Sequence, residues 1–236
     1  MLVLVHGAGH TSHVWYAVQE HLRHPSLAVN LPGRHDRPAD LATVTIDAAV
    51  RSVRIDVAAA TSGDVVLVGH SASGVVLPAL AAHLGKQVVH LVFVAGLCAP
   101  DGAVVAETVR PGHRDEMTAR LAEMRARYRG HMLGPNSVGD TTPTVDDVKV
   151  AMGIESLNFM SQTVSWQGVP PDLGRTFVRC LRDQIQPRAM QEQLIANCGA
   201  STVIDIDSGH TPALDAPAEL AAILDRIAEA ADPQAP

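Results

Sequence analysis

The sequence predicts an α/β fold with a doubly wound parallel sheet. Two observations support this. Short runs of β-branched and aliphatic residues alternate with segments of helical periodicity, and such alternation is typical of parallel sheets. The run at residues 88–95 is apolar throughout, as in a strand that is covered on both faces. The expected strands are residues 2–5, 27–31, 65–69, 88–95, 176–181 and 202–206.

Helical periodicity fills most of the intervals between these strands. Apolar residues recur at helical spacing in residues 14–22, and longer helices are expected at residues 46–60, 188–197 and 218–230. A further helix should run from the residues after Ser71 to Gly85. Pro78 falls in its second turn, which predicts a kink or an early restart because proline lacks the N–H that a helix interior needs.

The composition limits the kinds of protein that this chain could be. Its 236 residues, 47% of them hydrophobic, suit one domain or a core with an inserted lid. The net charge of −7 and the lack of a basic run argue against nucleic acid or an anionic membrane as partner. The first residues have no basic n-region, and no apolar run reaches the length of a membrane span, about 18 residues. Cys98, Cys180 and Cys198 are widely spaced, so we expect reduced thiols in a cytoplasmic protein.

The alternation of strands and helices stops between residues 97 and 175. One strong helix is expected near residues 115–128. Residues 97–175 also contain Phe159, Trp166 and five of the seven methionines, which are Met117, Met124, Met132, Met152 and Met160. Methionine often simply fills irregular gaps in a core. Alternatively, these residues form a helical lid over an apolar pocket. We therefore expect residues 1–96 and 176–236 to form the core, and residues 97–175 to form the lid.

The stretch at residues 65–77 has the features of a nucleophile elbow. A strand reaches Gly69, a sharp turn carries Ser71, and a buried helix follows. Strand and helix pass closely at such an elbow, so the residues two positions either side of the serine must be small. Gly69 satisfies this, and Ser73 does so approximately, because the second glycine comes one position later at Gly74. An ordinary strand-to-helix turn with an N-cap serine is the alternative.

A general base and an acid follow Ser71 at the ends of later strands. His210 alone among the 12 histidines lies in a short loop between the last strand and the last helix. Asp183 lies at the end of the next-to-last expected strand, residues 176–181. Sites in open parallel sheets form at the carboxyl ends of the strands. Asp101 and Asp207 are rival candidates for the acid. A serine with a histidine base and a carboxylate that orients it is the arrangement of nucleophilic acyl transfer.

The glycine loop at residues 6–10 can supply the rest of the site. Its spacing is not that of a dinucleotide loop, and it lacks a P-loop lysine. Acyl transfer needs backbone N–H groups for the developing oxyanion, and we expect these from Ala8 and Ala72. No histidine pair has convincing metal-ligand spacing, so no metal is expected. The candidate substrate-binding residues are His10, Trp15, Met132, Phe159, Met160 and Trp166.

Several segments of the chain together carry a family resemblance. They are His6-Gly7-Ala8-Gly9-His10, Trp15-Tyr16, Gly69-His70-Ser71, the segment 178–183 with Gln191, and His210-Thr211-Pro212 with Leu214, Pro217, Glu219 and Leu220. These segments resemble the α/β-hydrolase family that contains plant methylesterases, hydroxynitrile lyases and their bacterial esterase relatives. The resemblance covers nearly the whole core and matches the lid poorly. It implies an α/β-hydrolase fold with a six-stranded, mostly parallel sheet, an inserted helical lid, no cofactor, and a triad of Ser71, Asp183 and His210.

Two positions separate the branches of that family. Its lyases carry a threonine after the first-loop histidine and a lysine after the catalytic histidine, where this chain has Gly7 and Thr211. Both differences favour ester hydrolysis. The methylesterases usually carry Asp-His-Met around the base, so Gly209 and Thr211 leave the methyl-ester substrate open.

The leading hypothesis is a serine esterase that acts on a small or medium apolar ester. A lyase or another cofactor-free reaction on the same scaffold is the first alternative, and a hydrolase-fold receptor that binds its ligand without turnover is the second. Esterase and thioesterase use the same acyl-enzyme chemistry, and the sequence does not separate them. The expected partner is a small-molecule ester, with no nucleic acid or membrane. The sequence leaves the oligomeric state open, and a homodimer is one candidate.

Overall fold

The computed structural model describes residues 1–34, 36–109, 112, 114–127 and 145–231. The strands are β1 (Leu2–Val5), β2 (Ser26–Val29), β3 (Val65–His70), β4 (Val88–Val94), β5 (Gly174–Cys180) and β6 (Thr202–Ile206). The α-helices are α1 (Tyr16–Gln19), α2 (Ile46–Ala60), α3 (Leu77–Leu84), α4 (Val105–Val109), α5 (Arg114–Arg127), α6 (Val145–Met160), α7 (Arg188–Cys198), α8 (Pro212–Asp215) and α9 (Pro217–Ala230). Short 3₁₀ helices are η1 (Ser12–Trp15), η2 (Leu41–Thr43), η3 (Ser71–Val75) and η4 (Gly85–Gln87).

The described strands form one six-stranded sheet in the order β2-β1-β3-β4-β5-β6, and all neighbouring pairs are parallel. The expected parallel sheet is therefore confirmed. The chain reverses its direction of strand addition between β1 and β3, which is where open α/β sheets form their sites. Val5 pairs with Gly69 across these strands. This register places the glycine loop after β1 directly beside the turn after β3.

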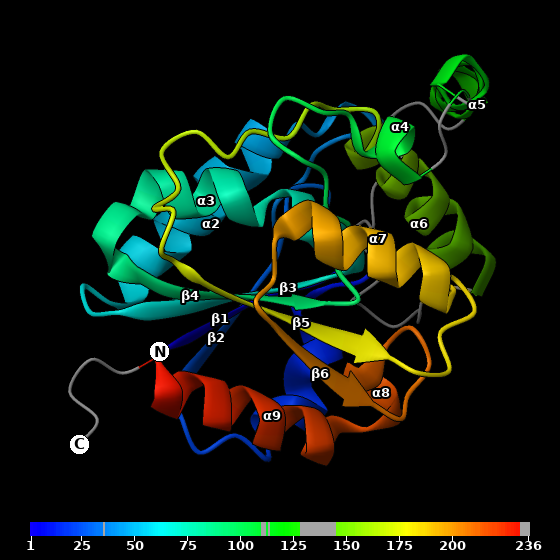
Figure 1. Ribbon diagram of the computed structural model, residues 1–236. Helices are drawn as coiled ribbons and strands as arrows, with labels where there is room; N and C mark the ends of the chain where they lie inside the picture. Colours follow the sequence, from blue (N-terminus) through cyan, green and yellow to red (C-terminus); the bar gives the residue numbers. More distant parts are fainter. Residues whose placement is uncertain (35, 110–111, 113, 128–144, 232–236) are drawn as a thin grey trace.

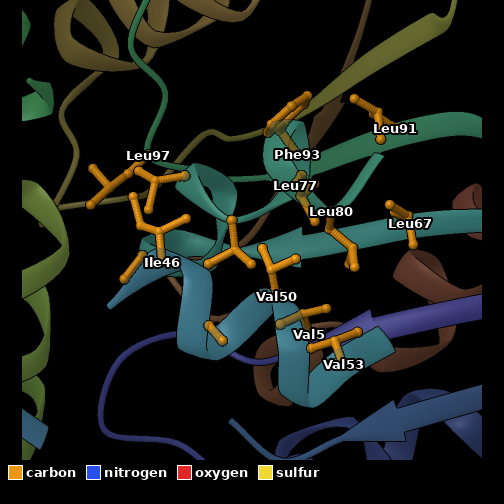
Figure 2. Close-up of a cluster of buried hydrophobic side chains, with 14 of the residues drawn as sticks. Val5, Ile46, Val50, Val53, Leu67, Leu77, Leu80, Leu91, Phe93 and Leu97 are labelled. Carbon is orange, nitrogen blue, oxygen red and sulfur yellow. The ribbon is translucent and has the colours of Figure 1, made fainter. Parts of the chain in front are cut away.

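Helices cover both faces of the sheet. In Figure 1, α2, α3 and α7 lie on one face and α9 lies on the other. Each face has its own buried apolar cluster, because the alternating side chains of each strand point to opposite faces. Figure 2 shows one of these clusters, in which Val50 and Val53 of α2 gather with Val5, Leu67 and other strand side chains. The two packed faces fix the strand ends that carry the polar loops.

The elements differ from the sequence predictions mainly at their ends. Helix α2 has the predicted bounds, residues 46–60. The segment 14–22 contains the 3₁₀ helix η1 and the one-turn helix α1 instead of one continuous helix. The early restart at Pro78 is confirmed, because η3 ends and α3 begins with this proline in its first turn, where its missing N–H costs nothing. Helix α8 was not predicted.

Helices α4, α5 and α6 come between β4 and β5 and lie at the carboxyl ends of the strands (Figure 1). The two ends of this insertion are joined, since Val164 N–H donates to Ala103 O and Gly102 N–H donates to Val164 O. We keep the name lid for residues 97–175.

Met132, one of the residues expected to bind substrate, lies outside the described residues. In the described part of the chain, no helix is long and apolar enough to cross a membrane.

All three cysteines are described, and each is a free, buried thiol, as expected. Burial raises the pKa of the Cys180 thiol to about 12. This thiol is therefore protonated at neutral pH. The cytoplasmic location inferred from the cysteines stays a prediction.

Candidate active site

The turn after β3 holds Ser71 in a strained backbone conformation. Its φ of +50° is unusual for a residue with a side chain, and such strain is typical of a nucleophile elbow. The conformation is held from the neighbouring loop, because Leu97 N–H donates to Ser71 O at 2.8 Å. Ser71 begins η3, so the N–H of Ala72 lies at the start of a helix, where backbone donors lack intrahelical partners.

The packing around the elbow explains its departure from the usual glycine spacing. A Cβ on Gly69 would lie 2.9 Å from the Leu77 side chain, and a Cβ on Gly74 would lie 2.5 Å from the backbone oxygen of Leu97. The strand therefore needs glycine at 69, and the loop after β4 needs it at 74. Ser73 is tolerated because its buried hydroxyl lies 3.0 Å from Val5 O and 2.9 Å from His70 O, so it has acceptors for its proton.

Three side chains from three strand ends form a hydrogen-bonded chain. His210 Nδ1 lies 2.7 Å from Asp183 Oδ2, and His210 Nε2 lies 2.8 Å from Ser71 Oγ. A carboxylate only accepts, so the imidazole proton is on Nδ1 and Nε2 is free to accept from the serine. This is the geometry of a nucleophile, a general base and an orienting acid.

The loop after β5 holds Asp183 in place. Its Oδ1 accepts from the backbone N–H groups of Ile185 and Gln186, both at 2.8 Å. Gln191 stabilises the same loop, since its amide bonds to both backbone groups of Cys180 and to Gln186 O. The carboxylate has no exposed surface, which leaves His210 as its one side-chain partner among the described residues.

The two rival acids, Asp101 and Asp207, bond to groups other than His210. Asp101 accepts from the backbone N–H of Trp166 at 2.7 Å, and Asp207 forms an exposed ion pair with Arg182. The geometry therefore favours Asp183 over Asp101 and Asp207.

The glycine loop after β1 presents the Ala8 N–H. Leu31 N–H donates to His6 Nε2, so the proton of this ring is on Nδ1, which donates to Gly7 O at 2.9 Å. His10 N–H also reaches Gly7 O, at 3.3 Å. Gly7 O and Ala8 N–H belong to one trans peptide and point in opposite directions. Holding the oxygen therefore orients the N–H that we expect to stabilise an oxyanion.

His70 lies between the glycine loop and the His210 loop. Its Nε2 lies 2.8 Å from His210 O and can donate to it. Its buried Nδ1 has no hydrogen-bond partner within the described part of the chain, and a Cβ on Gly7 would come within 2.7 Å of this atom. Gly7 therefore leaves the space that the His70 ring occupies. Burial lowers the pKa of His70 well below its usual value, and the neighbouring His210 adds to this effect.

His10 lies beside these rings, with its centroid 5.8 Å from that of His70. Burial, and then the positive charge of Arg34, lower its pKa to about 4. His10 is therefore neutral at physiological pH. It is not among the residues that line the cavity described next.

A cavity of about 240 Å³ opens above Ser71. Its walls come from the loop after β4, the lid helices α5 and α6, the segment between Asp183 and α7, and α7 itself. Apolar side chains predominate, and Glu116 and Arg120 of α5 add two charged groups. The lining residues are Ser71, Leu97, Glu116, Met117, Arg120, Ser156, Leu157, Met160, Ile185, Gln186 and Met190.

Of the residues expected to bind substrate, Met160 lines this cavity, whereas three aromatic residues are placed elsewhere. Trp15 is completely buried beneath the sheet, edge-on to His70. Phe159 has no exposed surface and packs in the apolar core. Trp166 closes the base of the lid, because its indole N–H donates to Ala99 O and Arg175 stacks 4.5 Å above its ring. These three side chains therefore lie outside the lining of this cavity and serve packing, and their part in binding substrate stays a prediction.

Among the described residues, no group of three or more histidine, cysteine or acidic side chains is arranged to hold a metal ion. Ser71, His210 and Asp183 each have a hydrogen-bond partner within this group of three.

Comparison with known proteins identifies the family. Residues 2–223 match the model of the alpha/beta hydrolase family. The chain belongs to this family. A relative of this hydrolase is a protein named lipase LipV from Mycobacterium tuberculosis, which is 27% identical over 250 residues, covering 94% of this chain and 91% of the relative.

Solved structures confirm that the fold is that of alpha/beta hydrolases. An extracellular alpha/beta-hydrolase from a Paenibacillus species, described as homologous in structure and function to tobacco salicylic acid binding protein 2, superposes with a TM-score of 0.74 at 17% identity, over 95% of this chain and 97% of that one. A pyrethroid hydrolase from Sphingobium faniae JZ-2 gives 0.66 at 22% identity, over 99% and 98%. The family resemblance seen in the sequence is confirmed.

Sequence reasoning missed most of the cavity lining. Leu97 was a visible candidate, because it follows a strand that ends at the same edge as Ser71. Ile185 and Met190 also had a signal, since both lie shortly after Asp183. Leu157 had no signal, because which face of α6 meets the cavity depends on how the lid docks.

Proposed function

We propose that this alpha/beta hydrolase is a serine carboxylesterase that forms an acyl-enzyme on Ser71. One observation carries the proposal: His210 lies within hydrogen-bonding distance of both Ser71 Oγ and Asp183 Oδ2, and Ser71 lines a largely apolar cavity. A serine hydroxyl is a weak nucleophile until such a base takes its proton. The names of the relatives, which include a lipase and a pyrethroid hydrolase, support ester hydrolysis.

The reaction proceeds in two halves. Ser71 Oγ attacks the ester carbonyl carbon, its proton passes to His210 Nε2, and the carbonyl π pair moves to oxygen. The N–H groups of Ala8 and Ala72 stabilise this oxyanion. The intermediate then collapses, the bond to the alcohol breaks, and His210 returns the proton to the leaving alcohol. In the second half, His210 takes a proton from water as the water oxygen attacks the acyl carbon. The bond from that carbon to Ser71 Oγ then breaks, the acid is released, and His210 returns the proton to Ser71 Oγ.

The cavity suits small or medium apolar substrates. Its volume of about 240 Å³ lies just below the range of roughly 300–1,000 Å³ that is usual for pockets of drug-sized ligands. Met117, Met160 and Met190 supply flexible apolar walls that adapt to more than one acyl or aryl group.

A lyase reaction fits the site less well. The lyases that the sequence resembles carry a threonine after the first-loop histidine, which corresponds to Gly7. A Cβ at Gly7 would lie 2.7 Å from His70 Nδ1, so a threonine would collide with the ring that supports His210. Thr211 also stands where those lyases have lysine.

The proposal is tested with p-nitrophenyl esters from acetate to octanoate and a Ser71→Ala variant. We expect turnover by the wild-type protein and a loss of at least about 10³-fold in kcat for the variant, because among the described residues no other hydroxyl or thiol bonds to His210 Nε2. Ser73→Ala is the matched control, since Ser73 lies two positions away and its hydroxyl bonds to two backbone oxygens, those of Val5 and His70. This variant should keep most of the wild-type kcat. Turnover that survives Ser71→Ala would contradict the proposal.

A further inference from the structure

A completely buried ion pair joins the lid to the core beside the glycine loop. Arg34 follows β2, and Glu155 lies on α6; neither side chain has exposed surface. The contact is bidentate, with Arg34 Nη1 2.6 Å from Glu155 Oε1 and Nη2 2.8 Å from Oε2. Buried ion pairs often contribute little to stability compared with apolar side chains of the same size, because both charges lose their hydration. This pair therefore needs another explanation.

Both members of the pair also hold the glycine loop. Gly9 N–H donates to Glu155 Oε2 at 2.9 Å, and Arg34 Nε–H donates to His10 O at 2.9 Å. Arg34 is itself fixed by a 3.1 Å bond to Pro32 O. The loop is thus held at Gly9 and His10, the two residues after Ala8.

The same helix forms a wall of the cavity. Ser156, Leu157 and Met160 line the cavity, and Glu155 comes directly before them on α6. The helix that contacts bound substrate is therefore the helix that fixes the glycine loop. No other charged side chain of the described lid reaches this loop by a hydrogen bond.

We propose that Arg34 and Glu155 are positioning residues for the oxyanion hole. Their bonds to Gly9 and His10 hold Ala8 N–H where it meets the oxyanion, while His6 fixes the other end of the same peptide through Gly7 O. Oxyanion donors act only within a narrow range of distance, so a small displacement of this loop lowers the rate. This inference rests on the proposed esterase function and adds residues to its machinery.

Two double variants separate positioning from simple stability. Arg34→Met/Glu155→Leu removes both charges and the acceptor for Gly9 N–H, with no buried charge left unpaired. Arg34→Met/Glu155→Gln also removes both charges but keeps an amide oxygen for Gly9 N–H. The control is Arg37→Met/Asp56→Leu, which removes a 2.6 Å ion pair between the same loop after β2 and α2, away from the glycine loop. Thermal unfolding shows which variants fold.

We expect Arg34→Met/Glu155→Leu to lose about 10-fold in kcat on p-nitrophenyl butyrate with little change in KM. The glutamine variant should recover part of this loss, because it restores the acceptor for Gly9 N–H but not the bond from Arg34 to His10 O. The control should stay within about twofold of the wild type. A second readout is inhibition by an aryl trifluoromethyl ketone. Ser71 Oγ adds to its carbonyl carbon, the carbonyl π pair becomes an oxyanion, and the serine proton moves to His210. Its Ki should rise with the leucine variant in parallel with the fall in kcat.

The outcomes distinguish the two claims. If the wild-type protein hydrolyses the ester and the folded leucine variant keeps full kcat and Ki, the positioning role is wrong and the esterase function stands. If the leucine and glutamine variants lose the same activity, the Gly9 bond has no part in catalysis and the inference is also wrong. If the wild-type protein neither turns over esters nor binds the ketone, the proposed function fails, and the positioning role fails with it.

Discussion

The carboxylate of Asp183 accepts hydrogen bonds on both oxygens, and each has a distinct effect. The two backbone donors at Oδ1 fix the side chain, and Oδ2 sets the tautomer of the His210 imidazole by accepting from Nδ1. An amide at this position would present either an oxygen or a nitrogen to His210. Asp183→Asn should therefore lower kcat by about 10³–10⁴-fold, because the wrong tautomer leaves Nε2 protonated and unable to accept from Ser71. Steady-state kinetics on p-nitrophenyl butyrate measure this.

The matched controls are Asp101→Asn and Asp207→Asn. Asp101 bonds to Trp166 at the base of the lid, and Asp207 pairs with Arg182 at the surface. Both variants should stay within about twofold of the wild-type kcat. A large loss in either one, with Asp183→Asn active, would assign the acid to that residue instead.

The low pKa of His10 predicts that the folded protein loses stability on acidification. Its pKa is about 4 in the folded protein and about 6.5 when exposed, so between these values the unfolded chain binds more protons. The free energy of unfolding therefore rises with pH across this window and is lost on acidification. One such group contributes a slope of at most about 1.4 kcal/mol per pH unit.

His10→Gln removes this group while keeping a polar side chain. In urea unfolding between pH 4.5 and 6, the free energy of unfolding should rise less steeply with pH in the variant. The difference in slope is at most about 1.4 kcal/mol per pH unit. His6 and His70, whose pKa values are also lowered by burial, keep part of the slope. Equal slopes in the two proteins would contradict the assignment to His10.

The hydrogen-bonded group of Ser71, Asp183 and His210 could be predicted from the sequence because each residue has a local signature: Ser71 at an elbow, and Asp183 and His210 at the ends of strands. The aromatic residues could not. Trp15 and Trp166 were expected near substrate, yet both are used for packing, and nothing in the sequence states which neighbours a ring will meet. Glu155 carried a weak signal, since it is an acidic residue in an apolar stretch of helix.

At the scale of elements, the strand-turn-helix unit of β3, η3 and α3 organises the site. The backbone of the loop after β4 presses against it at Gly74 and Ser71. Gly74→Ala would place a Cβ 2.5 Å from Leu97 O, and backbone cannot move aside as a side chain can. We expect a loss of about 1–3 kcal/mol in stability, as in overpacked cores, together with a lower kcat.

Gly63→Ala is the control for this substitution. Its Cβ would meet only the Thr61 hydroxyl, at 3.5 Å, and its backbone has no positive φ. It should leave kcat unchanged and stability within about 0.5 kcal/mol. If both alanine variants unfold at the same temperature as the wild type, the elbow is not under the steric constraint that its geometry indicates.

Element types were predictable where periodicity was strong, as in α2 and the strands. The shift of the second glycine to position 74 had no explanation in the sequence, because its cause is the backbone of a loop that follows a different strand. Helix α8 was missed for a similar reason: it is a single turn after Thr211 that begins with Pro212, too short to have a period.

For the whole molecule, the sheet positions the site and the helices above it wall the cavity. Apolar clusters on both faces of the sheet hold the strand ends, and α5 and α6 form part of the cavity wall over them. Leu157→Trp should therefore narrow the cavity and lower kcat/KM for p-nitrophenyl octanoate about 10-fold or more, with less effect on the acetate. The midpoint of thermal unfolding should change little, because the Leu157 side chain lines the cavity.

Ile55→Trp is the control, since Ile55 is 68% exposed on α2, away from the cavity. It should leave the preference for acyl length unchanged. A uniform loss for all esters in Leu157→Trp would mean that the lid supports the fold rather than selects the substrate.

The parallel sheet and its layers were predictable because they follow from alternation along the chain. The docking of the lid was not, since methionine-rich helices pack in many ways. The division into residues 97–175 and the flanking core stays a prediction. So do the homodimer and the expected absence of nucleic-acid and membrane partners.

The central claim is that Ser71 is an activated nucleophile, and covalent labelling tests it most directly. The protein is treated with p-nitrophenyl diethyl phosphate, which loses p-nitrophenolate when a serine oxygen attacks phosphorus, and is then measured by intact mass and peptide mapping. We expect one diethylphosphoryl group per chain, on the peptide that contains Ser71, and none in Ser71→Ala or His210→Ala. Labelling at another residue, or equal labelling of the variants, would contradict the account.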